Sequence, residues 1–400
     1  MGTSLVLFKV FGIEVRVHWS FVLILIYGAF STSGSQLNPL FGALYGILVI
    51  LLLFVCVTLH EFGHALVAKY YKVNVPSITL LPIGGVASLE RMPDKPLEEF
   101  LIAIAGPLVN FAIAVLLTPL AFVAYNMSAQ AATLPLNLSN LLAIMQTPSL
   151  AGLLVNLTLT NIALALFNLL PAFPMDGGRI LRALLAMSMS YVRATQVAVL
   201  VGRIIAVLMA IWGIWGGGSI LLLLIAFFVY VGGGSERDAV ESRAVLKNVM
   251  AGQALTPSAQ KLYTSERVSR AMDLIMSTYQ TDYPVMDLGG AFVGVLTRAH
   301  LIHALHTTGA EARIVDIMLP AEQVPVCSPR QTLATVWEKM TESGSRDVAI
   351  KDGNNFLGLI TIDDINEVFQ VVGAALSNNI NPSGGAQTQP PANRPETSGV

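Results

Sequence analysis

Apolar residues dominate roughly the first 234 positions of the chain, and polar residues reach ordinary frequency only after them. The apolar segments lie at about 19–30, 41–71, 97–126, 150–171, 196–213 and 218–233. A helix needs about 20 consecutive apolar residues to cross a bilayer. The pattern therefore predicts a polytopic α-helical membrane domain with about six transmembrane helices.

The segment after the second predicted span follows a different pattern. Residues 73–92 contain β-branched runs interrupted by Pro82 and by the pair Gly84-Gly85. Such runs bounded by turn-forming residues are typical of strands. We expect a small hairpin or sheet here, with a plain connecting loop as the alternative.

The remainder of the chain divides into two parts. Residues 235–375 have normal polar content and contain an internal repeat, whereas 376–400 are rich in Asn, Pro, Ser, Gly and Gln. In the repeat, PVMD at 284–287 leads to GVLT at 294–297, and VAIK at 348–351 leads to GLIT at 358–361, 64 residues on. Helical patterns flank each copy, which predicts an α/β module built from two similar units. We expect the domains to be 1–234, 235–375 and a disordered tail at 376–400.

Composition excludes an ordinary soluble protein. The chain is 54% hydrophobic and 12% charged, with a mean hydropathy of +0.66. A net charge of −2 argues against a nucleic-acid-binding surface. The two cysteines, Cys56 and Cys327, fall in different predicted domains, so no disulfide framework is expected.

The distribution of basic residues predicts the orientation in the membrane. The segments before span one, between spans two and three, and between spans four and five contain Lys9, Arg16, Lys69, Lys72, Arg91, Lys95, Arg179, Arg182 and Arg193. The alternate connections, 31–40 and 127–149, contain no charge. Positive residues remain on the cytoplasmic side, so both termini and the polar domain should face the cytosol.

One charged residue stands inside the second predicted span. Glu61 is the only formally charged residue between Arg16 and Lys69, and it lies within the pentad His60-Glu61-Phe62-Gly63-His64. An ionisable group in a membrane span is costly and usually functional. On a helix, His60 and His64 project from one face about one turn apart, as in the zinc-binding pattern His-Glu-x-x-His, whose glutamate is a general base. A hydrogen-bonded His-Glu-His cluster is the alternative, and we favour metal binding.

A third metal ligand is expected at Asp176. No formal charge occurs between Glu99 and Asp176, which lies between Pro174 and the pair Gly177-Gly178. Proline and glycine at membrane depth indicate irregular backbone that lines protein or a wet cavity. Asp176 could instead cap the following helix. The two roles are compatible, and beside the pentad we favour ligation, since a catalytic zinc takes three protein ligands.

These motifs together resemble the site-2 protease family of intramembrane zinc metalloproteases. The resemblance rests on the pentad, on Asn168-Leu-Leu-Pro171 through Pro174-Met-Asp176-Gly-Gly-Arg179, and on Gly106-Pro-Leu-Val-Asn110 between them. It implies that His60, His64 and Asp176 bind Zn²⁺, that Glu61 activates water, and that Asn168 helps to place the substrate backbone. It also implies that an unwound transmembrane substrate adds as a strand to 73–92.

The repeated units resemble a pair of CBS domains, which often bind adenine nucleotides such as ATP, ADP or AMP between the copies. In that family the Gly-apolar-apolar-Thr segment is followed by an aspartate that contacts ribose. Thr361 and Asp364 match this pattern in the second copy, whereas His300 replaces the aspartate in the first. We therefore expect one nucleotide site or none, and a structural or dimerising pair is the alternative.

The leading hypothesis is a zinc endopeptidase of regulated intramembrane proteolysis, cleaving membrane proteins under the control of a cytosolic CBS pair. By family analogy, its substrates would be membrane-tethered regulators of transcription or their inhibitors. A CBS-regulated metal ion channel or transporter and a non-catalytic membrane receptor are the alternatives. The sequence leaves the substrate, the nucleotide and any homo-oligomer formed through the CBS pair open.

Overall fold

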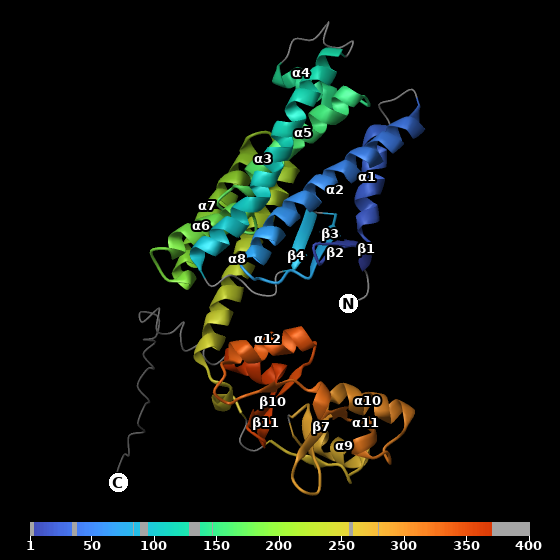
Figure 1. Cartoon of the computed structure of the whole chain (residues 1–400), viewed down its shortest axis with the longest axis vertical. Helices are drawn as coiled ribbons and strands as arrows, with labels where there is room; N and C mark the ends of the chain where they lie inside the picture. Colours follow the sequence, from blue (N-terminus) through green and yellow to red (C-terminus); the bar gives the residue numbers. More distant parts are fainter. Residues whose placement is uncertain are drawn as a thin grey trace, which may run out of the picture. The chain divides into compact units, whose positions relative to one another are not determined.

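The chain folds into two compact units, Met1–Asp238 and Ala239–Val400, in a computed structural model. The structure describes residues 4–33, 38–82, 84–88, 95–127, 137–145, 147–255, 259–278 and 280–369. Figure 1 shows a helical first unit and a mixed α/β second unit, and each is described by itself. The tail predicted at 376–400 lies outside the described residues.

Apolar helices make up most of the first unit. Five of those described are long and apolar enough to cross a membrane: α2 (Pro39–Tyr70), α3 (Pro96–Met127), α5 (Leu150–Asn168), α7 (Tyr191–Trp215) and α8 (Ile220–Asn248). The sixth apolar helix, α1 (Phe21–Ser33), is shorter, and so are α4 (Leu138–Met145) and α6 (Asp176–Ala186). Each predicted apolar segment corresponds to one apolar helix, so the predicted membrane fold is confirmed.

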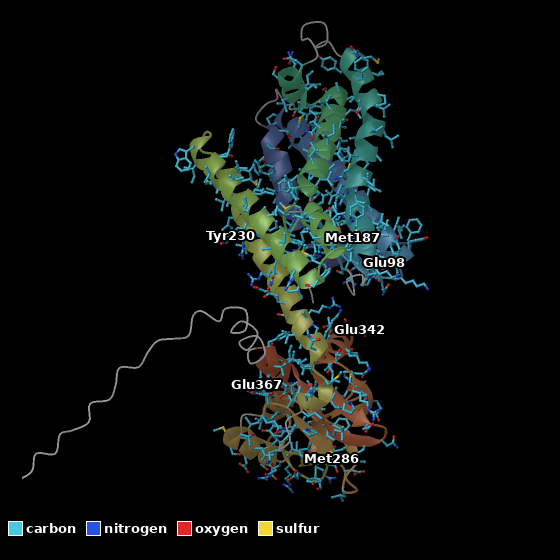
Figure 2. All side chains as sticks on the ribbon, turned by 90° about the vertical axis from the view of Figure 1, so that its left-hand side faces the viewer. Glu98, Met187, Tyr230, Met286, Glu342 and Glu367 are labelled. Carbon is cyan, nitrogen blue, oxygen red and sulfur yellow. The ribbon has the colours of Figure 1, made fainter. Side chains whose placement is uncertain are left out.

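The outer surfaces of these helices are apolar. Figure 2 shows side chains projecting outward along them, with Tyr230 labelled on α8. Large apolar side chains on α7 and α8 are exposed, among them Trp212 at 71% and Phe227 at 68%. In water such a surface would drive association, whereas in a bilayer it faces lipid at no cost.

A four-stranded sheet packs beside α2, in the order β1-β2-β3-β4. Its strands are β1 (Ser4–Val10), β2 (Ile13–His18), β3 (Ser77–Leu81) and β4 (Gly84–Ser88). The antiparallel pair β3–β4 confirms the hairpin predicted within 73–92, and β2 pairs with β3 in parallel. The strands β1 and β2 were not predicted. Every residue of β1 is exposed, including Leu5 at 70%.

Small residues let α2 and α3 approach closely. A side-chain carbon at Gly63 on α2 would lie 2.9 Å from the carbonyl oxygen of Ala105 on α3. Close backbone approach through small residues is the usual means of helix packing in membranes. The contact brings α3 directly against the turn of α2 that carries His60 and His64.

The second unit contains two small sheets with helices packed against them (Figure 1). One sheet has the order β5-β6-β7-β8 (Leu262–Tyr263, Tyr283–Met286, Phe292–Leu296, Leu319–Pro320) and the other β11-β10-β9 (Asn355–Thr361, Asp347–Asp352, Val326–Cys327). The helices include α9 (Val268–Ser277), α10 (Arg298–Thr307), α11 (Ile314–Ile317) and α12 (Leu333–Ser343), and residues 362–369 are also helical. The predicted α/β repeat is therefore confirmed.

The register corrects one detail of that repeat. Tyr283 pairs with Leu296 in the first copy, and Val348 pairs with Ile360 in the second. The first strands are therefore offset by 65 residues and the second strands by 64. The turn between them is one residue shorter in the second copy, so the predicted match of Pro284 with Val348 is wrong by one position.

Candidate metal centre

The two histidines of the pentad come from one face of α2. This helix begins at the cap Asn38, whose side chain accepts hydrogen bonds from the amides of Leu40 and Phe41, and it continues unbroken to Tyr70. Because His60 and His64 are four residues apart, their rings lie one above the other, with centroids 4.7 Å apart. Their Nε2 atoms are 3.1 Å apart.

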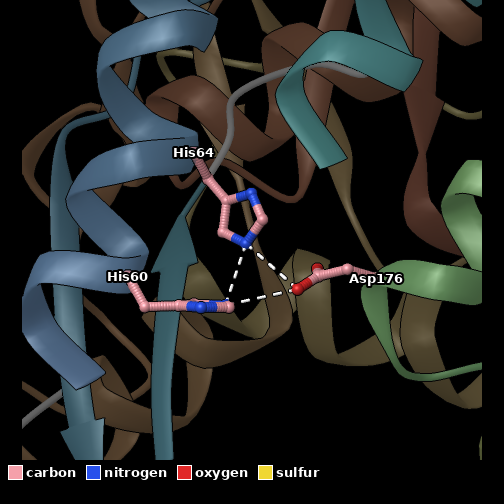
Figure 3. Close-up of side chains that lie close together, drawn as sticks. All are labelled: His60, His64 and Asp176. Carbon is pink, nitrogen blue, oxygen red and sulfur yellow. Dashed lines mark hydrogen bonds and ion pairs between the residues drawn. The ribbon is translucent and has the colours of Figure 1, made fainter. Parts of the chain in front are cut away.

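Asp176 faces the two histidines from α6, as Figure 3 shows. Its Oδ2 atom lies 3.2 Å from Nε2 of His60 and 3.2 Å from Nε2 of His64. The three side chains are only 7%, 10% and 14% exposed. Asp176 is the first residue of α6, while Met175 is the N-cap and makes no side-chain capping bond. Asp176 therefore lies next to the two histidines, as expected.

The glycine pair after Asp176 allows the chain to turn tightly into α6. A side-chain carbon at Gly178 would lie 2.7 Å from the backbone nitrogen of Phe173, and one at Gly177 would meet the carbonyl oxygens of Leu169 and Leu170. No side chain fits at either position without moving the backbone. The irregular segment predicted from the prolines and glycines therefore serves to bring Asp176 to the histidines.

The donor set fits a zinc ion. Two imidazole nitrogens and a carboxylate oxygen are ligands that zinc takes in catalytic sites. Tetrahedral ligands at about 2.0–2.1 Å from zinc lie about 3.3 Å from one another, close to the 3.1 and 3.2 Å found here. Within the described part of the chain, these residues form the one group of three such ligand atoms within 4.8 Å of one another.

A backbone carbonyl orients one of the imidazoles. Nδ1 of His64 donates a hydrogen bond to the carbonyl oxygen of Ile102 on α3, at 2.6 Å. Because this nitrogen carries the proton, Nε2 has its lone pair free for a metal. Nδ1 of His60 is buried and has no hydrogen-bond partner among the described residues.

Gly106 leaves room for both imidazoles against α3, a role that the sequence did not reveal. A side-chain carbon at this position of α3 would lie 2.6 Å from Cε1 of His64, 2.7 Å from Cε1 of His60, and closer still to Nε2 of His64. The imidazoles therefore pack directly on the α3 backbone. The motif Gly106-Pro-Leu-Val-Asn110 supported the family resemblance, but nothing in the sequence said which helix this glycine faces.

Glu61 is half-buried and lies beside the sheet. A side-chain carbon at Gly85 would be 2.6 Å from Cγ and 3.3 Å from Oε1 of Glu61. Gly85 belongs to β4, which among the described strands pairs with β3 alone and so forms an edge of the sheet. The pentad glutamate and an open strand edge are thus neighbours.

The remaining predicted site residues lie elsewhere. Asn168 is the last residue of α5 and is half-buried, and its role stays a prediction. In the second unit, the backbone amide and the hydroxyl of Thr361 both donate to Oδ2 of Asp364 at 2.7 Å. Both residues line a cavity of about 260 Å³. His300 lines a second cavity, of about 350 Å³.

Comparison with known proteins places the chain in a family. Residues 48–211 match the model of peptidase family M50, and residues 314–370 match the CBS domain. The zinc metalloprotease MJ0392 of Methanocaldococcus jannaschii is 32% identical over 91% of this chain and 96% of its own length. The putative zinc metalloprotease Rip3 of Mycobacterium tuberculosis is 28% identical over 93% of this chain and 94% of its own.

Among solved structures, the site-2 protease from Methanocaldococcus jannaschii is 36% identical, covers 58% of this chain and 95% of its own, and has a TM-score of 0.40. The chain belongs to peptidase family M50, the site-2 protease family. It is a zinc metalloprotease with a C-terminal CBS domain, as the resemblance implied.

Proposed function

We propose that this enzyme is an intramembrane endopeptidase that cleaves membrane-spanning proteins in regulated intramembrane proteolysis, with zinc held by His60, His64 and Asp176. The observation that carries the proposal is that Asp176 of α6 meets two histidines of α2, an apolar helix of 32 residues, with its carboxylate oxygen 3.2 Å from both Nε2 atoms. A peptidase centre in such a helix acts on chains that enter the membrane. Membership of a peptidase family also disfavours the transporter and receptor alternatives.

Each residue of the centre has a distinct task. A zinc ion bound by the three ligands supplies Lewis acidity for peptide hydrolysis. Glu61 takes a proton from the attacking water and returns it to the leaving amine. Asn168 holds the substrate backbone.

The change Glu61→Gln tests the mechanism. The amide keeps the shape of the side chain but is no longer a base, and general acid–base catalysis contributes about 10²- to 10⁴-fold. We expect zinc content to stay at the wild-type level while cleavage of a single-span substrate by reconstituted protein falls by at least about 10². A variant that retains zinc and cleaves at the wild-type rate would contradict the proposal.

Strand addition to β4 is the proposed mode of substrate binding. Hydrolysis needs an extended chain, and an edge strand offers unpaired amides and carbonyls to one. The proximity of Gly85 to Glu61 supports binding at this edge. Proline at Val86 or Ser88 removes an amide, so we expect each change to reduce cleavage while zinc content is retained. Unchanged cleavage in both variants excludes addition through these amides.

We also propose that both termini and the CBS domain face the cytosol, as the basic residues indicate. Single cysteines placed at Asn38 and at Ser328 in a cysteine-free chain should then label from opposite sides of sealed vesicles. Labelling of both positions from one side would refute this orientation.

The cavity at Thr361 and Asp364 is the proposed adenine-nucleotide site, with ribose hydroxyls donating to Asp364. The described residues that line it include Asp282, Asp363 and Glu367 but no Lys or Arg. Phosphates entering this cavity would meet carboxylates, so ATP should bind as its Mg²⁺ complex and AMP more readily than free ATP. Calorimetry of the full-length protein with ATP, ADP and AMP, with and without Mg²⁺, tests this, and Asp364→Asn is the matched variant. Flat traces for all three leave a structural or dimerising role.

A further inference from the structure

A fully buried arginine, Arg182, lies in the second half of α6. The side chain of Arg182 is 0% exposed. Its Nε and Nη2 atoms donate to Oε1 of Glu99 at 2.9 and 2.5 Å, and its Nη1 atom donates to Glu236 at 2.5 Å. The guanidinium also stacks over the rings of Phe173 and Tyr191, 4.9 Å from each centroid. A buried charge is tolerated only when it is paired, and these hydrogen bonds and ring contacts hold the guanidinium in one place.

Arg182 and its contact Phe173 lie on either side of Asp176 in the sequence. Arg182 follows Asp176 by six residues on the same helix, and Phe173 precedes it by three. The guanidinium-to-ring contact therefore holds together the two ends of the segment that presents the carboxylate. Asp176 can shift relative to Phe173 and Arg182 only if this contact breaks or the first turns of α6 deform.

Arg182 also binds α3, the helix that packs against the two histidines. Glu99 lies on α3, one turn before Ile102, whose carbonyl accepts the bond from His64. Gly106, seven residues after Glu99, packs against both imidazoles. Residues seven apart on a helix share one face. One side chain thus ties the helix that carries Asp176 to the helix that orients His64.

We propose that Arg182 is a positioning residue that sets the separation between Asp176 and the two histidines. Metal sites require ligand distances correct to about 0.2 Å, and the Arg182–Glu99 pair ties α6 to α3 close to these ligands. The proposal rests on the metal centre proposed above but not on the cleavage reaction. Sequence alone presents Arg182 only as one more basic residue near a membrane edge.

The test measures zinc affinity by competition with a chelator, using full-length protein in detergent. Loss of residues that orient metal ligands typically weakens metal binding about 10- to 100-fold, and we expect Arg182→Gln to fall in that range. Arg182→Lys keeps the charge but cannot donate through two nitrogens to Glu99, so it should be weakened as well. Arg193→Gln, an exposed arginine on α7, is the matched control and should bind zinc as wild type does.

A second variant guards against failure of the first to fold. Glu99→Gln keeps the size of the side chain and should weaken zinc binding in the same direction. The double change should cost little more than Arg182→Gln alone, because the two groups act as one unit. Variants that unfold at lower temperature but bind zinc with wild-type affinity when folded would overturn the proposal. If wild type binds zinc but cleaves nothing, the endopeptidase proposal fails while this one still stands.

Discussion

Replacing Gly106 with alanine is the most direct test of how the metal centre is built. The added methyl group would lie 2.6 Å from Cε1 of His64 and 2.7 Å from Cε1 of His60. Ordinary contacts of such a carbon begin at 3.4 Å, and Nε2 of His64 lies closer to it than either Cε1 atom does, so α3 or the imidazoles must move by more than about 0.8 Å. That movement is more than about four times the 0.2 Å that a metal site tolerates.

The expected effect on zinc binding follows from this displacement. We expect the affinity to fall at least about 10- to 100-fold, or about 1.4 to 2.8 kcal/mol. The overall fold should be affected less, because overpacking one methyl group costs about 1–3 kcal/mol and many other contacts hold α2 to α3.

Chelator competition on the full-length variant measures the affinity, and thermal unfolding measures the fold. Gly233→Ala is the matched control, because a methyl group there meets Val199 at 3.5 Å, an ordinary contact on α8. If Gly106→Ala binds zinc as tightly as Gly233→Ala does, the close packing of the imidazoles on α3 is not what positions them.

Two further changes probe other parts of the chain. Gly85→Ala puts a methyl group 2.6 Å from Cγ of Glu61 and so displaces the base. Cleavage should fall at least about tenfold while zinc content is unchanged. Loss of zinc together with cleavage would refute a specific effect on Glu61. In the second unit, burial, with the nearby Asp282, raises the pKa of Asp347 from 3.8 to about 7. The folded state thus holds this proton up to about pH 7 and the unfolded state loses it near pH 4, so stability falls across that range by up to about 4 kcal/mol. Asp347→Asn should remove this dependence, as measured by hydrogen exchange of strands β10 and β11 in the intact protein at pH 5.5 and 7.5; an unchanged dependence would show that Asp347 is not its source.

The ligands were predictable because their chemistry is unusual for their setting. His60, Glu61 and His64 interrupt an apolar segment, and Asp176 ends a long stretch without charge. Charged and metal-binding residues are costly in a membrane, so their presence marks a site before any fold is known. The helices were predictable for the related reason that span length follows from bilayer thickness.

Residues that support the ligands could not be found in this way. Gly106 and Gly85 act by lacking a side chain, and their value depends on which distant helix or strand faces them. Arg182 has the ordinary sequence context of a basic residue, and only its burial against Glu99 distinguishes it. Such contacts join residues far apart in sequence, and periodicity carries no information about them.

The N-terminal strand β1 was not predicted either, and it bears on how deeply the metal centre lies in the membrane. Among the described strands, β1 has a partner on one side only, and hydrocarbon does not tolerate unpaired backbone groups. Its exposed side chains, such as Leu5 and Phe8, are poorly suited to water. The boundary between lipid and water suits both, so we expect β1 to lie at the membrane surface. Neighbouring strands are about 4.8 Å apart, which puts β4 about 14 Å from β1. With β1 at the surface, the base beside β4 would lie within about 14 Å of it, so we expect hydrolysis inside the membrane to need no long channel.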